Sequence, residues 1–366
     1  MRLALWTFGL YVASERSIPH PCHFEQARNG WPLMPLQYGD GLAFKLFGVW
    51  ERWDACWYAR IATFGYSPDG STAFFPLFPL LERGVALGGP HVVVAGMAVN
   101  LVAMVFALWG VYRIAAAEHG DPVARRSLLL LSVFPASFFL LAPFSEAVFL
   151  ALAVWALERA RARSWAAAAA LALLAGSGRP VGGLLFLPLA WLVLKEWRAG
   201  TRGRGLAWPA AAVAAAPLAG LAYLQYTVGV VGQSMLDAQA RWSGAPFSPP
   251  WQLFGETWRW IARTGDPFQA LQLGLLVALT AVFALGFRRL PAELTLYVAP
   301  LLLLAWTRIL PTPLTSTARQ MTVMFPLFIT LALLLEDRRA LWSYAILSLL
   351  LLGALANEFV IGNFVG

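Results

Sequence analysis

The chain has 366 residues, of which 59% are hydrophobic and 13% charged, and its formal net charge is +8. Soluble domains carry about 25% charged residues, so this composition excludes an ordinary soluble enzyme and indicates a polytopic membrane protein. The basic residues lie in short connections between apolar runs, which does not indicate a nucleic-acid partner. We expect one membrane-embedded domain over residues 1–366.

The apolar runs predict eleven membrane-spanning helices and therefore an all-α fold. A span takes about 20 apolar residues, or fewer where the helix is buried among others. The four predicted spans from 126 to 195 are short, and they predict hairpins around a polar cavity that opens to the outer side. The spans are expected near 2–18, 91–116, 126–141, 145–160, 164–178, 181–195, 207–231, 268–288, 293–310, 318–335 and 340–357.

Residues 73–89 are apolar but are predicted to lie on the outer membrane surface as an amphipathic helix. The stretch is short and carries two prolines together with Glu82 and Arg83. Counting it as a span would place Arg113 on the outer side, against the positive-inside rule. The first extracytoplasmic loop is therefore expected over residues 19–90.

The distribution of basic residues predicts the orientation in the membrane. Short loops rich in arginine and lysine face the cytoplasm. A second large extracytoplasmic loop is expected over 232–266. The residues assigned to the cytoplasmic side are Arg2, Arg113, Arg125, Arg126, Arg159, Arg161, Arg163, Lys195, Arg198, Arg202, Arg204, Arg288, Arg289, Arg338 and Arg339.

The N-terminal run and the two cysteines concern the first loop. The run is interpreted as a retained first span rather than a cleaved signal, because no small-residue cleavage site precedes the polar "SERS". Cys22 and Cys56 both fall in the first outer loop. A disulfide forms in an extracytoplasmic compartment, but two free thiols fit the sequence equally well.

The segment "RWDACWY" carries the first candidate for chemistry, Asp54, between Trp53 and Trp57. Burial beside aromatic rings raises the pKa of a carboxyl group and neighbouring arginines lower it, which are the opposed effects that set a general base. An ion pair on the surface with Arg52 or Arg60 would give the same pattern.

Two further carboxylates are candidates for the same cavity. Asp40 lies in "QYGDG", a sequence that also fits a plain turn. Glu146 lies in "APFSEAVF", where a negative charge after Ser145 also suits the start of a helix.

Three arginines on the outer side are candidate phosphate ligands. They are Arg179 in "GSGRPVGG", Arg241 in "DAQARWSG" and Arg319 in "PLTSTARQMTVMFPLF". The planar guanidinium group pairs with two phosphate oxygens, and an ionisable group inside a membrane is costly unless it has a function. The alternative is that these side chains reach out to lipid headgroups.

Several signatures of cofactor sites are absent from the sequence. It has no P-loop, no dinucleotide fingerprint and no cysteine–histidine cluster with metal spacing. His20 and His23 with Cys22 are only a weak metal motif. No cofactor is therefore predicted, although a divalent metal remains open if Asp40 or Glu146 converges on Asp54. A transferred group would have to arrive on a lipid.

Two quoted stretches carry a specific resemblance. "RWDACWYARIATFGY" followed by "AFFPLFPLLERG" resembles the PIG-V family of mannosyltransferases, which belong to the GT-C glycosyltransferases. The segment "FPASFFLLAPFSEAVFLALA" is similar to another part of that family, with Phe144 where tyrosine is usual. "GSGRPVGG" keeps the family arginine but has Val181 for an asparagine, and "STARQMTVMFPLFITLA" has Ala318 for a proline. "AQARWSG" resembles the second loop of bacterial members, and the alanine- and arginine-rich composition indicates a bacterial protein.

The resemblance implies a GT-C fold and an inverting transfer from polyprenyl-phosphate mannose to a lipid or glycan acceptor. It implies Asp54 as the general base, and it implies phosphate contacts for Arg319 and Arg179. Trp53, Trp57 and Tyr58 would pack the loop or stack on sugar faces, and Arg241 and Trp242 would border the cavity from the second loop. The site would face the extracytoplasmic side of a bacterial plasma membrane, among membrane lipids; the sequence leaves any partner subunit unknown.

Three alternatives remain from the sequence. The chain could use another polyprenyl-phosphate sugar, such as glucose or arabinose. It could move lipid-linked sugars across the membrane without catalysis, in which case Asp54 need not act as a base. It could also be a non-catalytic partner of another transferase.

Overall fold

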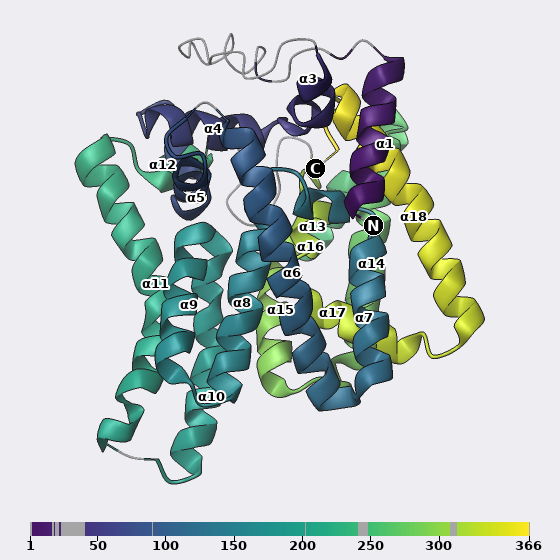
Figure 1. Ribbon diagram of the computed structural model, residues 1–366. Coiled ribbons are helices and arrows are strands. Elements are labelled where there is room, and N and C mark those ends of the chain that lie inside the picture. Colours follow the sequence, from purple (N-terminus) through teal and green to yellow (C-terminus); the bar gives the residue numbers. More distant parts are fainter. Residues whose placement is uncertain are drawn as a thin grey trace.

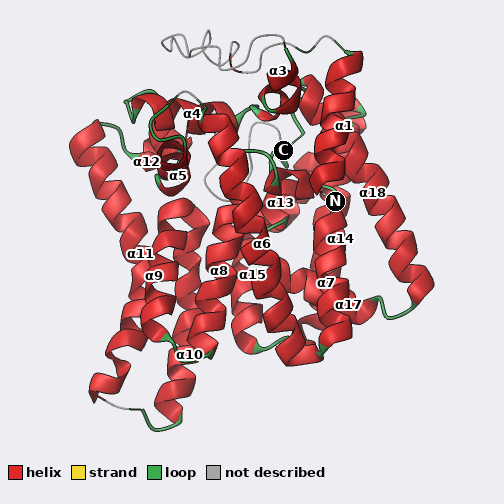
Figure 2. Cartoon of the chain, in the orientation of Figure 1, coloured by secondary structure: helices red, strands yellow, loops and turns green. Residues whose placement is uncertain are grey.

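The computed structural model describes residues 2–16, 18, 22, 41–89, 91–201, 203–240, 248–307 and 313–365. Within these ranges the regular elements are all helices, as Figure 2 shows. The α-helices are α1 (Arg2–Glu15), α3 (Leu42–Leu46), α4 (Asp54–Phe64), α5 (Leu77–Val85), α6 (Val92–His119), α7 (Asp121–Val133), α8 (Glu146–Arg161), α9 (Trp165–Gly178), α10 (Phe186–Arg198), α11 (Ala207–Tyr226), α12 (Met235–Ala240), α13 (Pro250–Thr264), α14 (Pro267–Gly286), α15 (Ala292–Thr307), α16 (Thr317–Met321), α17 (Phe325–Leu334) and α18 (Arg338–Ile361). Short 3₁₀ or π segments are η1 (Gly48–Trp50), η2 (Ser71–Ala73), η3 (Ser137–Leu140), η4 (Pro180–Leu185), η5 (Gly203–Leu206), η6 (Thr227–Val231) and η7 (Phe287–Arg289).

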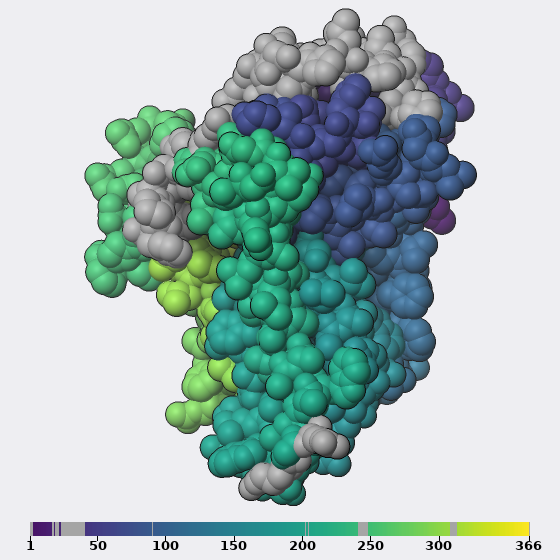
Figure 3. Space-filling view, turned by 90° about the vertical axis from the view of Figure 1, so that its left-hand side faces the viewer, coloured from purple at the N-terminus to yellow at the C-terminus, as the bar shows by residue number. Residues whose placement is uncertain are grey.

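The long helices run side by side, and their connections gather at two opposite ends (Figure 1). One end, uppermost in Figure 1, carries α3, α4, α5 and α12. Figure 3 shows the same arrangement from the side, with the dark-blue residues of the first loop above the teal residues of α9 to α11. The opposite end carries the short α6–α7, α8–α9 and α10–α11 connections, where the sequence places its clusters of arginine.

Five described helices are long and apolar enough to cross a membrane, and α9, α15 and α17 are shorter apolar helices. The five cover Val92–His119, Pro180–Arg198, Ala207–Val231, Pro267–Arg289 and Arg338–Ile361. The chain is thus a multi-pass membrane protein whose regular elements, over the described residues, are helices, as its sequence predicts. The count of eleven spans and the single-domain organisation stay predictions.

Two predicted boundaries were wrong, and proline explains both. The span expected near 126–141 is α7, which begins at Asp121 and ends at Val133. The next two residues are Phe134 and Pro135, and the residue before a proline is disfavoured in a helix. The span expected near 318–335 is divided into α16 and α17, because Pro326 suits the first turn of a new helix rather than a helix interior.

The stretch at 73–89 forms a short helix, α5, that does not qualify as a span. Its Leu80 is exposed and its Phe78 is fully buried, as expected for a two-faced helix. Glu82 is also fully buried, and its Oε1 lies where a side chain on Gly96 of α6 would stand. The absence of a Cβ at Gly96 therefore allows α5 and α6 to pack closely. That α5 rests on a membrane surface stays a prediction.

Cys22 and Cys56 form a disulfide, with their Cα atoms 5.6 Å apart. The sequence left this pairing open. The bridge ties α4 to a residue 34 positions earlier in the chain. Trp57 lies in one buried cluster with Cys22 and Cys56, so the disulfide and an aromatic ring together hold α4 in place.

Candidate functional site

Asp54 is the first residue of α4, at the loop-bearing end of the bundle. A carboxylate at the start of a helix is stabilised by the unpaired backbone N–H groups there. The Arg319 Nη1 atom lies 2.6 Å from Asp54 Oδ2, in an ion pair between residues 265 positions apart. The Asp54 side chain is 29% exposed and that of Arg319 is 12% exposed. The carboxylate is therefore accessible while its partner is largely enclosed.

Arg319 joins two carboxylates through different nitrogen atoms. Its Nε atom lies 3.1 Å from Glu146 Oε1, while Nη1 contacts Asp54. The centre of the guanidinium group lies 5.2 Å from the ring of Phe144 and 5.7 Å from that of Phe139. Aromatic rings at this distance attract a cation and exclude water from it. The guanidinium group of Arg319 is thus held in one orientation.

Glu146 is the first residue of α8 and is 1% exposed. It receives a second arginine, because Arg179 Nη1 lies 2.5 Å from its Oε1. Asp54, Glu146, Arg179 and Arg319 carry two negative and two positive charges, so they neutralise one another. A buried charge is tolerated only when it is paired in this way.

A hydroxyl pair extends this cluster toward α5. Arg179 donates to the Ser145 hydroxyl oxygen at 3.1 Å, and the Tyr58 hydroxyl donates to the same oxygen at 2.9 Å. Burial, and then the charge of Asp54, raise the pKa of Tyr58 above its usual range. Tyr58 therefore stays a neutral hydrogen-bond donor that fixes one side of the site.

Local sequence explains why Arg179 faces Glu146. It directly follows α9 in an extended conformation, which the next residue, Pro180, favours. A Cβ on Gly182 would clash with the backbone of Ala175, so the chain folds back against α9 only because residue 182 is glycine. The turn directs Arg179 into the cluster instead of continuing the helix.

Two glutamines of α14 position the short helix that bears Arg319. Gln272 Oε1 accepts hydrogen bonds from the backbone N–H groups of Thr317 and Ala318, at 3.0 and 3.2 Å. Gln269 Oε1 accepts from the Leu314 N–H at 3.1 Å. Both glutamines are buried in an otherwise apolar helix. Gln272 satisfies the first N–H groups of α16, which a helix leaves without internal partners, and Gln269 holds the chain just before that helix.

The other sequence candidates lie outside this cluster. The Trp57 ring stacks on Phe74 with centroids 5.3 Å apart, and Trp53 meets Phe364 edge to face at 4.9 Å. The contacts of both tryptophans are therefore packing contacts within the protein. The remaining candidates, Asp40, Arg241 and Trp242, lie outside the described residues, as do His20 and His23.

Sequence reasoning missed several residues that hold the site. Ser145 was considered only as the residue before a helix, although it links Tyr58 to Arg179. Gln272 gave a weak signal, as one of two polar residues three positions apart in an apolar run. Phe139 had no signal beyond its place in an aromatic segment.

A protein-bound metal ion needs several histidine, cysteine or carboxylate ligands close together. In the described ranges no three histidine, cysteine, aspartate or glutamate residues come together as a candidate metal site. Asp54 and Glu146 do approach each other, but through the shared guanidinium group of Arg319. A cation bound there would have to displace that arginine.

The described geometry defines a membrane protein with an acid–arginine cluster near one end of its helices. The chain is 34% identical to GPI alpha-1,6-mannosyltransferase 2 of Mus musculus over 156 residues, which are 39% of this chain and 32% of that protein. It is 33% identical to the Rattus norvegicus protein of the same name over 168 residues, 43% of this chain and 34% of that protein. A Cricetulus griseus protein of that name is 34% identical over 149 residues.

These matches confirm the resemblance to the PIG-V mannosyltransferases over part of the chain. The matched stretch spans about a third of the length of the curated relatives. No family model matches the chain, and no solved structure matches it.

Proposed function

We propose that the protein is a membrane mannosyltransferase of the PIG-V type, which transfers mannose from polyprenyl-phosphate mannose to a hydroxyl of a lipid-linked or glycan acceptor. The observation that carries the proposal is the Asp54–Arg319 ion pair, which joins a potential base to a potential phosphate ligand. Mannose is proposed as the sugar because the chain is similar to proteins named mannosyltransferases. A lipid-borne donor suits a site that lies where membrane helices end.

The proposed reaction is a single displacement at the anomeric carbon. The Asp54 carboxylate takes the proton of the acceptor hydroxyl as that oxygen bonds to the anomeric carbon. The bond between this carbon and the phosphate oxygen breaks, and its electron pair leaves with the polyprenyl phosphate. One displacement inverts the configuration at the carbon.

The arginines are suited to the leaving group. As the glycosidic bond breaks, negative charge develops on the phosphate, and a preorganised guanidinium group stabilises it without moving. Arg319 and Arg179 are fixed by Glu146 at 3.1 and 2.5 Å. Glu146 therefore acts as a positioning residue, which holds two cations next to each other.

The pairing of Asp54 also bears on the order of events. The Asp54 Oδ2 atom that accepts from Arg319 Nη1 at 2.6 Å is not free to accept from an acceptor hydroxyl. A donor phosphate at Arg319 would compete for that guanidinium group and leave Asp54 to bind the acceptor hydroxyl. We propose that donor binding precedes activation of the base.

The test is sugar transfer by the purified full-length protein, with polyprenyl-phosphate mannose and a lipid extract as acceptor. Asp54→Asn should lower the rate about 10²- to 10⁴-fold, the usual contribution of a general base. Asp237→Asn is the matched control, because Asp237 is an exposed carboxylate of α12. Full transfer by Asp54→Asn would remove Asp54 as the base. Movement of the donor across liposomes without any transfer would favour a transporter.

A further inference from the structure

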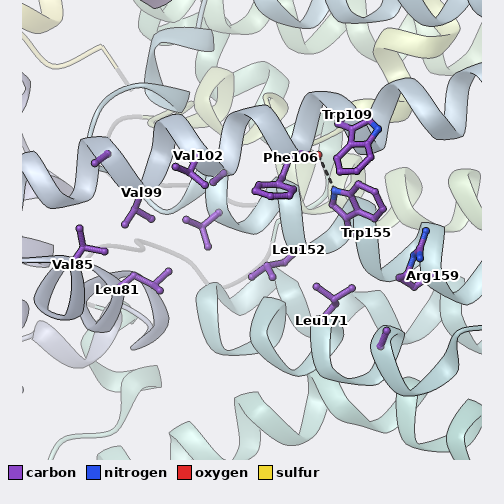
Figure 4. Close-up of a pocket in the computed structure, with 15 residues that line it drawn as sticks. Leu81, Val85, Val99, Val102, Phe106, Trp109, Leu152, Trp155, Arg159 and Leu171 are labelled. Carbon is purple, nitrogen blue, oxygen red and sulfur yellow. Dashed lines mark hydrogen bonds between the residues drawn. The ribbon is translucent and has the colours of Figure 1, made fainter.

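A long apolar groove lies between α6, α8 and α9 and reaches α5 at one end (Figure 4). Its volume is about 710 Å³. Leu152 and Trp155 of α8 form its floor, and Val102 of α6 and Leu171 of α9 form its sides. All of its lining residues are apolar except Arg159, which lies at one end. An apolar surface of this size on membrane-spanning helices faces lipid chains rather than water.

The groove has the length of a chain in one leaflet. It follows α6 from Val99 to Trp109, ten residues on. At 1.5 Å per residue this is about 15 Å. The hydrocarbon core of a bilayer is about 30 Å thick, so one leaflet contributes about half of that depth. The dimensions therefore fit one lipid chain lying along α6.

The end with Arg159 is positively charged. Glu158 lies 2.7 Å from Arg113 Nη2 and 2.5 Å from Arg159 Nε, so two arginines share one carboxylate. Both guanidinium groups also lie over the Trp155 ring, at 6.0 and 5.3 Å from its centre. The side chains of Arg113 and Arg159 are 47% and 32% exposed. This end can receive an anion, because the two arginines and the single carboxylate of Glu158 together carry one net positive charge.

Apolar side chains separate the other end of the groove from the site. Leu81 of α5 and Val148 of α8 line it there. The same two residues pack against Phe78 and Tyr58, which are buried. A lipid whose chain fills the groove thus has its phosphate at Arg159, on the opposite end of α8 from Glu146. The groove does not suit a lipid whose phosphate must reach Arg319.

We propose that this groove binds one acyl chain of an anionic phospholipid, with the lipid phosphate at Arg159 and Arg113. Basic pockets between membrane helices bind anionic headgroups in this way. The arginine-rich end is the cytoplasmic one by the positive-inside rule, so the lipid belongs to the cytoplasmic leaflet. The site is independent of the proposed transfer reaction.

The test uses the full chain in nanodiscs of phosphatidylcholine mixed with phosphatidylglycerol, followed by native mass spectrometry of the released protein. The wild type should retain one phosphatidylglycerol in preference to phosphatidylcholine. Val102→Trp should abolish the retention, because Val102 is 58% exposed and a large ring there fills the groove without disturbing the core. Arg159→Gln should weaken it about fivefold, the usual effect of one basic residue on an anionic lipid.

Two matched controls keep the result specific. Leu221→Trp adds the same ring to an exposed position of α11, and Arg125→Gln removes an exposed arginine from α7. Both should retain the phospholipid as the wild type does. Equal retention of the two phospholipids would overturn the proposal, as would unchanged retention in Val102→Trp. Retention of polyprenyl phosphate that is lost in Arg319→Ala would assign the groove to the donor instead.

Discussion

The two ends of α8 carry ion-pair clusters of opposite kinds. At its start, Glu146 is 1% exposed and joins Arg179 and Arg319, which come from distant parts of the chain. Near its end, Glu158 joins Arg159, its neighbour in the sequence, and Arg113, with both arginines substantially exposed. Burial makes the first cluster expensive to break and precise in its geometry. In the second cluster Glu158 is 9% exposed, and it is the exposure of the two arginines that makes their contacts adaptable and weak, which suits a headgroup contact.

The largest expected effect is a difference in the stability lost when Glu146 or Glu158 is replaced by alanine. Glu146→Ala leaves two nearly buried arginines without their shared partner, which should destabilise the protein by about 3–5 kcal/mol. Glu158→Ala removes the partner of two exposed arginines and should cost about 1 kcal/mol or less. Melting temperatures of both variants in one detergent measure the difference. Equal shifts would show that burial does not distinguish the clusters.

The second effect concerns the shape of the guanidinium group. Arg319 contacts two carboxylates through separate nitrogen atoms, which one ammonium group cannot reproduce. Arg319→Lys should lower sugar transfer about a hundredfold, as expected for a lost charge-stabilising donor. Arg159→Lys keeps the charge at the other end and should leave transfer unchanged. A fully active Arg319→Lys protein would mean that only charge, not geometry, is needed there.

A smaller effect tests how α16 is held. Gln272→Leu leaves the Ala318 N–H without its acceptor, while the Thr317 N–H keeps its bond to the Leu314 carbonyl, and the loss is about 1–3 kcal/mol. Because Arg319 moves with α16, transfer should fall about tenfold. The control is Gln252→Leu, since Gln252 lies on α13 and bonds to Glu256 near the surface. Transfer rates compare the two variants, and an equal small loss in both would remove Gln272 as a positioning residue.

A further effect concerns the pH dependence of stability that arises from carboxyl groups of the first loop. Burial, partly offset by Arg52, raises the pKa of Glu51 from 4.5 to about 8. Burial and the neighbouring Glu51 raise the pKa of Glu82 well above 4.5. An unfolded chain loses these protons above about pH 4.5 while the folded loop keeps them, so stability should fall as the pH rises from about 4.5 to 8.

Substitution of the two glutamates by glutamine tests the predicted fall in stability with rising pH. Glu51→Gln with Glu82→Gln removes both titrations, so the melting temperature of the double variant should depend less on pH between 5 and 8. Glu256→Gln on α13 is the control and should retain the dependence of the wild type. A double variant with the same pH dependence as the wild type would show that these carboxyl groups ionise normally in the folded protein.

Much of the fold followed from the sequence because a bilayer leaves the backbone few options. The long apolar runs marked α6, α11, α14 and α18 to within a few residues. The failures at α7 and α16–α17 have a local cause, since α7 ends two residues before Pro135 and Pro326 lies in the first turn of α17. The disulfide stayed open because chain separation does not reveal which thiols meet in space.

The pattern of apolar runs is enough to predict a helical membrane protein, and it draws attention to Asp54, Glu146, Arg179 and Arg319, because charged residues stand out against apolar runs. That these four side chains meet is visible only in the folded chain, where contacts join residues up to 265 positions apart. The fold also places Trp57 in a packing contact and gives Ser145 and Gln272 their roles. Partners of this kind depend on which helix ends gather in space, and apolar periodicity does not specify that arrangement.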